Sequence, residues 1–173
     1  MSGIVLAVYL STVYPSNSGG DSGELIVTAC NGGVAHPPGY PTYTMLSSLF
    51  VNFFQVGTKA YRVNVMSCIL GAGAAGWLVL TASRLCLGNV FAGIAAAGWF
   101  AFNPTVWLYS TQGEVFALNN FFCACLAFLL AQYFAVDTYE RELEQHRADT
   151  VKTTGKPKSS TSGPGSGQGK NAQ

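Results

Sequence analysis

Between Arg62 and Arg84 the chain reads VNVMSCILGAGAAGWLVLTAS, residues 63–83, without a single charged side chain. An α-helix rises about 1.5 Å per residue, so this stretch would extend about 32 Å, the thickness of one bilayer core. Two more apolar stretches follow, centred on 90–108 and 115–136. Together the three stretches predict three membrane-spanning helices and an all-α membrane protein.

The composition of the chain also favours lipid as its main solvent. Of the 173 residues, 49% are hydrophobic and 10% are charged, and the mean hydropathy is +0.29. A soluble domain usually carries about 25% charged residues. The net charge is +1, which argues against the concentrated basic patch that a nucleic-acid partner requires.

Two shorter apolar stretches leave the number of spans open. We interpret residues 4–14 as a first helix, and residues 41–56 as a helix that lies along the membrane face or enters and returns. Four spans place Arg84 and the basic residues after 136 in the cytoplasm, as the positive-inside rule favours, whereas a fifth span at 41–56 would reverse this. We therefore predict about four transmembrane helices, with a luminal first loop that contains short helices.

The composition further divides the chain into three parts. Residues 1–136 form the N-terminal transmembrane segment, and residues 137–150 form a helical extension into water. Residues 151–173 consist mainly of Lys, Ser, Thr, Gly and Pro, so they bury too little apolar surface to order themselves. We predict a disordered C-terminal tail.

Small residues recur at helical spacing within the apolar stretches. Gly71 with Ala75, and Gly93 with Ala97, predict helices that approach each other closely. The five cysteines are odd in number and mostly apolar in setting, which favours packing in helices over a disulfide framework or a zinc site. We predict no metal site.

Three acids are the candidates for chemistry, and the four-span count places all of them on one membrane face. Asp21 and Glu24 precede an apolar run, so a capping box, in which both acids bond the start of a helix, is the structural alternative to a catalytic role. Glu114 opens the last predicted helix, where an acid favours the helix dipole. Acids near a membrane are costly unless they are paired or used, which supports the functional reading.

Three further polar residues have similar alternatives. Arg62 at the start of a span either anchors the interface or contacts a phosphate. His36 lies in a proline-rich turn, where it either bonds the backbone or takes part in binding. Asn119 lies about one and a half turns beyond Glu114, where asparagines commonly form hydrogen bonds between helices.

Taken together and in order, these motifs resemble the transmembrane protein 260 family of protein O-mannosyltransferases. The resemblance covers residues 10–137 and rests on the following motifs: VYP at 13–15, GGDSGELI at 19–26, GVAHPPGYP at 33–41, AYRVN at 60–64 and EVFALNN at 114–120.

The family has the class C glycosyltransferase architecture. The resemblance implies a multi-pass protein of the endoplasmic reticulum membrane. It also implies that this protein moves mannose from dolichyl-phosphate mannose to Ser or Thr of immunoglobulin-like, plexin-type (IPT) domains in receptors such as plexins. It implies no cofactor beyond this lipid-linked donor. The partners would be membrane lipid, the donor and an acceptor protein domain.

The resemblance also assigns roles to residues of this chain. Class C enzymes carry a catalytic acid in the first luminal loop, which matches Asp21, with Glu24 beside it. His36, Arg62, Glu114 and Asn119 would then bind the donor or substrate.

The family continues into many more helices, so we expect a truncated form of this length to transfer little or no mannose by itself. The alternative is a non-enzymatic multi-pass membrane protein, either a small transporter or an assembly subunit. A transporter predicts acids that face a pathway at mid-bilayer, whereas a transferase predicts acids grouped at one surface.

Overall fold

The computed structural model describes residues 1–154, and all regular secondary structure in this range is helical. The elements are α1 (Ser2–Ser11), α2 (Ser22–Asn31), α3 (Pro41–Phe53), α4 (Lys59–Leu85), α5 (Val90–Ala101), α6 (Pro104–Ser110) and α7 (Phe116–Thr154). The chain divides into two units, of which the first covers Met1–Phe134 and the second begins at Ala135. The predicted all-α class is confirmed.

Two helices, α4 and α7, are long and apolar enough to cross a membrane. α4 contains the whole of the predicted span 63–83, and α7 contains 116–136 of the predicted span 115–136. Thr58 caps the start of α4, where its hydroxyl accepts a hydrogen bond of 3.1 Å from the backbone N–H of Tyr61. The charge-free length of each stretch therefore predicted both helices correctly.

The predicted span 90–108 is not one straight helix. α5 ends at Ala101, and α6 begins at Pro104 with its axis bent by 72°. The reason is local: proline disfavours a helical residue before it, and Asn103 caps α6 by accepting the Thr105 N–H at 3.0 Å. The α5–α6 pair is either one broken span or a re-entrant element.

The count of about four spans included the first helix, predicted over residues 4–14 and found as α1. It has 10 residues and ends at Ser11, so it rises about 15 Å, half of a bilayer core. The described residues therefore hold two candidate spans, or three if the bent pair is one. α3 begins at Pro41 as predicted, but its 13 residues rise only about 20 Å.

This first loop leads to a prediction about topology. Between Asp21 and Lys59 lie only α2 and α3, neither of which is long enough to span. Single cysteines at Asp21→Cys and Lys59→Cys should therefore react with a membrane-impermeant maleimide from the same side of sealed vesicles. Labelling from opposite sides would show that α3 crosses the membrane.

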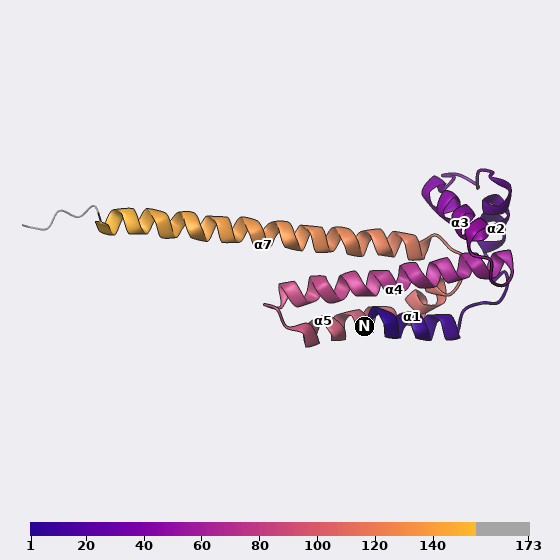
Figure 1. Ribbon diagram of the computed structural model, residues 1–173, viewed down its shortest axis with the longest axis horizontal. Helices are drawn as coiled ribbons and strands as arrows, with labels where there is room; N and C mark the ends of the chain where they lie inside the picture. The colour runs from indigo at the N-terminus through magenta and orange to yellow at the C-terminus, as the bar shows by residue number, and fades with distance from the viewer. Residues whose placement is uncertain (155–173) are drawn as a thin grey trace, which may run out of the picture. The chain divides into compact units, whose positions relative to one another are not determined.

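The first unit has α4 at its centre, with α1 and α5 packed along it, while α2 and α3 pack together near its N-terminal end (Figure 1). Small buried residues allow the close packing predicted for α4 and α5, since Ala75 and Ala97 are both fully buried. Tyr9 of α1 extends this core and donates a hydrogen bond of 2.7 Å to the carbonyl of Ala101. A second apolar cluster, around Leu25, Tyr43, Met66 and Leu118, joins α2 and α3 to α4 and α7.

The second unit continues α7 from Ala135 to Thr154. It contains the predicted helical extension 137–150, with an exposed ion pair of 3.0 Å between Arg141 and Asp137. The helix includes residues 151–154, which we had predicted to be part of the disordered tail. The rest of that prediction, residues 155–173, lies outside the described residues.

Candidate functional site

The start of α2 carries the acid predicted to be catalytic. Asp21 is the N-cap of α2, yet its side chain makes no capping hydrogen bond, and it is 64% exposed. Glu24 does not bond the start of the helix either, because its carboxylate reaches His36 instead. The capping box that the sequence offered as a structural alternative is therefore not formed.

Glu24 and His36 form a two-point contact between α2 and the proline-rich turn. The His36 backbone N–H donates to Glu24 Oε1 at 2.6 Å, and His36 Nδ1 lies 3.0 Å from Glu24 Oε2. The backbone N–H of His36, followed by its ring, lowers the pKa of the Glu24 carboxyl below its usual value. The other ring nitrogen, Nε2, lies 3.8 Å from Asp21 Oδ2, so His36 bridges the two acids of α2.

Glu114 reaches the same place from the loop between α6 and α7. The residue is buried, and its Oε1 lies close to Gly20, directly before the start of α2. Burial, followed by the negative charge of Asp21, raises the pKa of the Glu114 carboxyl, while the backbone N–H groups of Asp21 and Ser22, and His36, oppose the rise. The structure thus brings Asp21 and Glu114 together from positions far apart in the sequence.

Glycines on both sides permit the close approach of Glu114 to α2. A Cβ added at Gly20, whose φ is +59°, would lie 3.1 Å from Glu114 Oε1. A Cβ added at Gly113 would lie 3.1 Å from Asn64 Oδ1 and 3.2 Å from Ser22 Oγ. A side chain at either position would therefore crowd the contact of the Glu114 loop with α2 and α4.

Asn64 of α4 holds the segment that leads into Asp21. Its amide nitrogen donates to the carbonyls of Tyr14 and Ser16 at 2.8 and 2.9 Å. The backbone N–H of Tyr14 in turn donates to the Thr111 carbonyl at 3.1 Å. These bonds connect α4, the segment before α2 and the loop that carries Glu114, so the cluster rests on a fixed frame.

Arg62 makes its hydrogen bonds elsewhere. Its guanidinium donates to the carbonyls of Val51 and Gly57 at 2.7 and 3.2 Å, and to the side chain of Gln55 at 3.4 Å. These groups close the turn between α3 and α4. The structure therefore gives Arg62 a structural task in this turn and does not bring it into contact with the acids.

Asn119 lines a groove between the start of α3 and the start of α7. The groove has a volume of about 510 Å³ and is mostly apolar; its walls include Tyr40, Tyr43, Phe116 and Phe122. The ring of Tyr40 packs edge-on against His36, with a centroid distance of 5.5 Å. The groove thus begins beside the cluster formed by Asp21, Glu24, His36 and Glu114, which we call the acid cluster.

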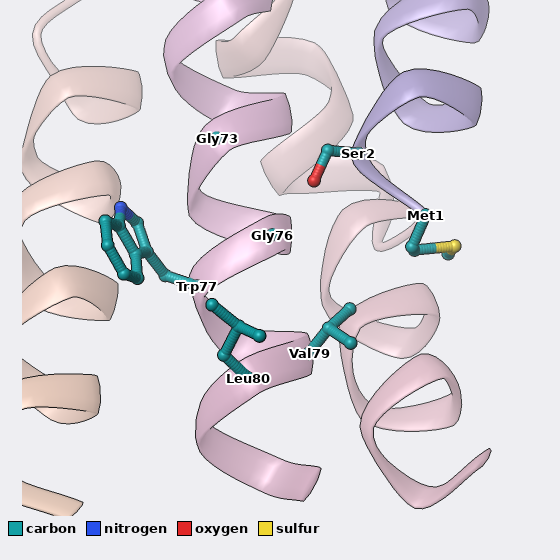
Figure 2. A pocket seen from close by; sticks show the side chains of 7 residues that line it. All are labelled: Met1, Ser2, Gly73, Gly76, Trp77, Val79 and Leu80. Atoms are coloured by element: carbon teal, nitrogen blue, oxygen red, sulfur yellow. The ribbon is translucent and has the colours of Figure 1, made fainter. Parts of the chain in front are cut away.

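A separate cavity of about 380 Å³ lies between the start of α1 and the middle of α4. Figure 2 shows its lining, with Met1 and Ser2 at the start of the chain and Trp77, Val79 and Leu80 on α4. None of the lining side chains is acidic, basic or nucleophilic apart from the Ser2 hydroxyl. We assign this cavity to helix packing.

Sequence reasoning did not identify several residues that build the site. Asn64 was quoted only as part of a motif, and Gly20, Ser22 and Gly113 received no role. Their functions depend on contacts between segments far apart in the chain. The one available signal was Asn64 itself, since an amide within an apolar span needs hydrogen-bond partners.

The elevated pKa of Glu114 predicts how stability depends on pH. Above its usual pKa of 4.5, the folded chain holds a proton that the unfolded chain releases, so the free energy of unfolding falls as pH rises through this window. Glu114→Gln removes this proton binding. Its stability relative to the wild type should therefore increase as the pH rises above 4.5, measured as denaturation midpoints in detergent. A relative stability that falls over this range would contradict the prediction.

The arrangement defines a multi-pass membrane protein whose first-unit acids gather outside its long helices. Residues 21–151 match the family described as "Protein O-mannosyl-transferase TMEM260 N-terminal domain". The chain therefore belongs to the TMEM260 protein O-mannosyl-transferase family, as the motifs suggested.

Two relatives give the extent of this similarity. The chain is 44% identical over 137 residues to Protein O-mannosyl-transferase tmem260 of Dictyostelium discoideum, which covers 78% of this chain and 17% of that protein. It is 47% identical over 129 residues to Protein O-mannosyl-transferase TMEM260 of Mus musculus, which covers 75% of this chain and 18% of that protein. The chain thus spans less than a fifth of the length of these relatives. No solved structure matches it.

Proposed function

We propose that this segment supplies the catalytic base of a protein O-mannosyltransferase, with Asp21 in that role. The observation that carries the proposal is the state of Asp21: it stands at the start of α2, is largely exposed and forms no capping bond. Glu24 is already bonded to His36, and Glu114 is buried. Among the three acids, Asp21 is the one whose carboxylate is open to an incoming hydroxyl group.

The proposed reaction is an inverting displacement at the sugar. The hydroxyl oxygen of an acceptor Ser or Thr attacks the anomeric carbon of mannose, the bond from that carbon to the phosphate oxygen breaks, and the lipid phosphate leaves with the electron pair. The proton of the hydroxyl group passes to the Asp21 carboxylate. General base catalysis of this kind contributes on the order of 10²–10⁴-fold.

The leaving phosphate needs a positive partner, and His36 is better placed than Arg62. The His36 ring lies 3.8 Å from Asp21, whereas the guanidinium of Arg62 is bonded within the α3–α4 turn. A protonated imidazole would stabilise the developing charge electrostatically. Asn119 and the apolar groove beside His36 would contact other parts of the donor, away from its phosphate.

The proposal also specifies the donor, the acceptor and the compartment. The donor is dolichyl-phosphate mannose, the acceptors are IPT domains in receptors such as plexins, and the site faces the lumen of the endoplasmic reticulum. The names of the two relatives, both protein O-mannosyl-transferases, support a sugar donor and a protein acceptor.

The placement of the acids favours a transferase over a transporter. Within the first unit the acids lie at the start of α2 and in the loop before α7, and neither α4 nor the 116–134 part of α7 contains an acid. A transporter would require ionisable groups at mid-bilayer along a pathway.

The test is transfer by a full-length enzyme that carries this segment. In the mouse relative, the matching segment is replaced by residues 21–151 of this chain, and the purified protein is given dolichyl-phosphate mannose and an IPT domain. Gain of one hexose on the acceptor, read by intact-mass spectrometry, supports the proposal. A folded hybrid that transfers nothing, beside an active mouse enzyme, would refute it.

A further inference from the structure

A side chain from a distant part of the sequence lies beside the start of α2. An N-cap aspartate normally accepts a hydrogen bond from a backbone N–H of the first turn, but Asp21 does not. The carboxylate of Glu114, more than 90 residues further along the sequence, faces the N–H groups of Asp21 and Ser22 instead. It is buried, and a Cβ added at Gly20 would lie 3.1 Å from its Oε1, so the carboxylate lies beside the residue that leads into the start of α2.

We propose that Glu114 is a positioning residue: by capping α2 from the α6–α7 loop, it keeps the Asp21 carboxylate out of the helix start and open to the acceptor hydroxyl. This inference rests on the proposed function and changes the role of Glu114. Sequence resemblance placed it among the donor-binding residues, whereas the structure places it beneath the acid.

The chemical consequence follows from what a cap does to a carboxylate. A carboxylate that accepts backbone N–H bonds is stabilised in its ionised form and is a weaker base. If Asp21 capped its own helix, it would lose basicity and would point away from an incoming hydroxyl. A second acid that takes the N–H groups removes both problems.

The frame around Glu114 fits this role better than it fits substrate binding. Gly113 allows the loop to approach Ser22 and Asn64 within van der Waals distance, and Asn64 holds the segment before Asp21 through two carbonyls. Glu114 is buried, whereas Asp21 and His36 on the same cluster are not. A residue that binds donor would need the exposure that those two have.

The first test compares Glu114→Ala with Glu114→Gln in the full-length hybrid enzyme. The Gln amide oxygen can still accept the α2 N–H groups, so this variant should keep most of its kcat. The Ala variant should lose about 10- to 100-fold in kcat, since a misplaced catalytic group costs up to this much, while KM for the donor stays unchanged. Each kcat is calculated per concentration of folded enzyme. A raised donor KM with unchanged kcat, or equal kcat in wild type and Glu114→Ala, would overturn the proposal.

The second test approaches the same contact from the opposite side with a matched pair of glycines. Gly20→Ala brings a methyl group against Glu114 Oε1, whereas an added Cβ at Gly19 meets nothing within 4 Å. Both glycines have positive φ, +59° and +94°, so both variants carry backbone strain. Gly20→Ala should reduce kcat more than Gly19→Ala; the reverse order would count against the contact.

A structural measurement separates this inference from the proposed function. In the 173-residue chain in lipid nanodiscs, the carboxyl ¹³C resonance of Asp21, assigned with Asp21→Asn, should shift in Glu114→Ala and stay in place in Glu114→Gln. No shift in the Ala variant would refute the capping role. If the shift occurs but Asp21→Asn transfers mannose normally in the hybrid, the proposed function fails and the structural inference stands.

Discussion

Asp21→Asn should reduce mannosyl transfer by a full-length enzyme carrying this segment on the order of 10²–10⁴-fold, because it removes the general base while keeping the shape of the side chain. Folding should be retained, since asparagine is as good an N-cap as aspartate and the Asp21 side chain makes no capping bond that could be lost. The measurement is kcat for hexose transfer, together with the denaturation midpoint of the same preparation.

The control removes a carboxylate that lies outside the acid cluster. Asp137→Asn breaks an exposed i,i+4 pair with Arg141 in the second unit, an interaction worth about 0.3–0.5 kcal/mol, and transfer should not change. Glu24→Gln weakens the bond to His36 and should have a smaller effect than Asp21→Asn. Near wild-type transfer by Asp21→Asn would show that the base is another group, with Glu24 the next candidate.

The long helices could be predicted from sequence because one property determines them. A charge-free stretch of bilayer length has to be a helix in lipid, since all of its backbone groups need internal partners. This argument gave α4 and the apolar part of α7 almost to their ends. It did not detect the break at Asn103, because hydropathy is similar on both sides of Pro104 and the break depends on the local effects of an asparagine cap and a proline.

The sequence predicted that the three acids lie near one another, but not how they are bonded. Topology alone placed Asp21 and Glu114 on one face, and the structure brings them together. The local pattern of Asp21 and Glu24 nevertheless left a capping box open as an alternative, because sequence spacing records which bonds are possible within one helix. It does not record competitors from distant segments, and here Glu114 and His36 are those competitors.

Gly93→Ala, at the contact between α5 and α4, is the second substitution for which we expect a large effect, here on stability. A Cβ added at Gly93 would lie 2.5 Å from the Val79 carbonyl oxygen and 3.3 Å from the Ser83 backbone nitrogen. These atoms belong to the α4 backbone and cannot rotate away, so Gly93→Ala must separate the two helices. Overpacking of this kind costs about 1–3 kcal/mol, even though alanine favours a helix over glycine by about 1 kcal/mol.

A second glycine of α5 provides the comparison for this substitution. A Cβ added at Gly98 would meet only the terminal methyl of Met1, at 3.5 Å, which is ordinary contact with the end of a flexible side chain. Gly98→Ala should therefore be neutral or stabilise the chain by up to about 1 kcal/mol. The free energy of unfolding of both variants is measured by denaturation in mixed micelles, and it should be lower for Gly93→Ala by about 1–4 kcal/mol. Equal stabilities would mean that α5 does not pack on α4 at Gly93, and that the broken α5–α6 pair lies elsewhere in the membrane.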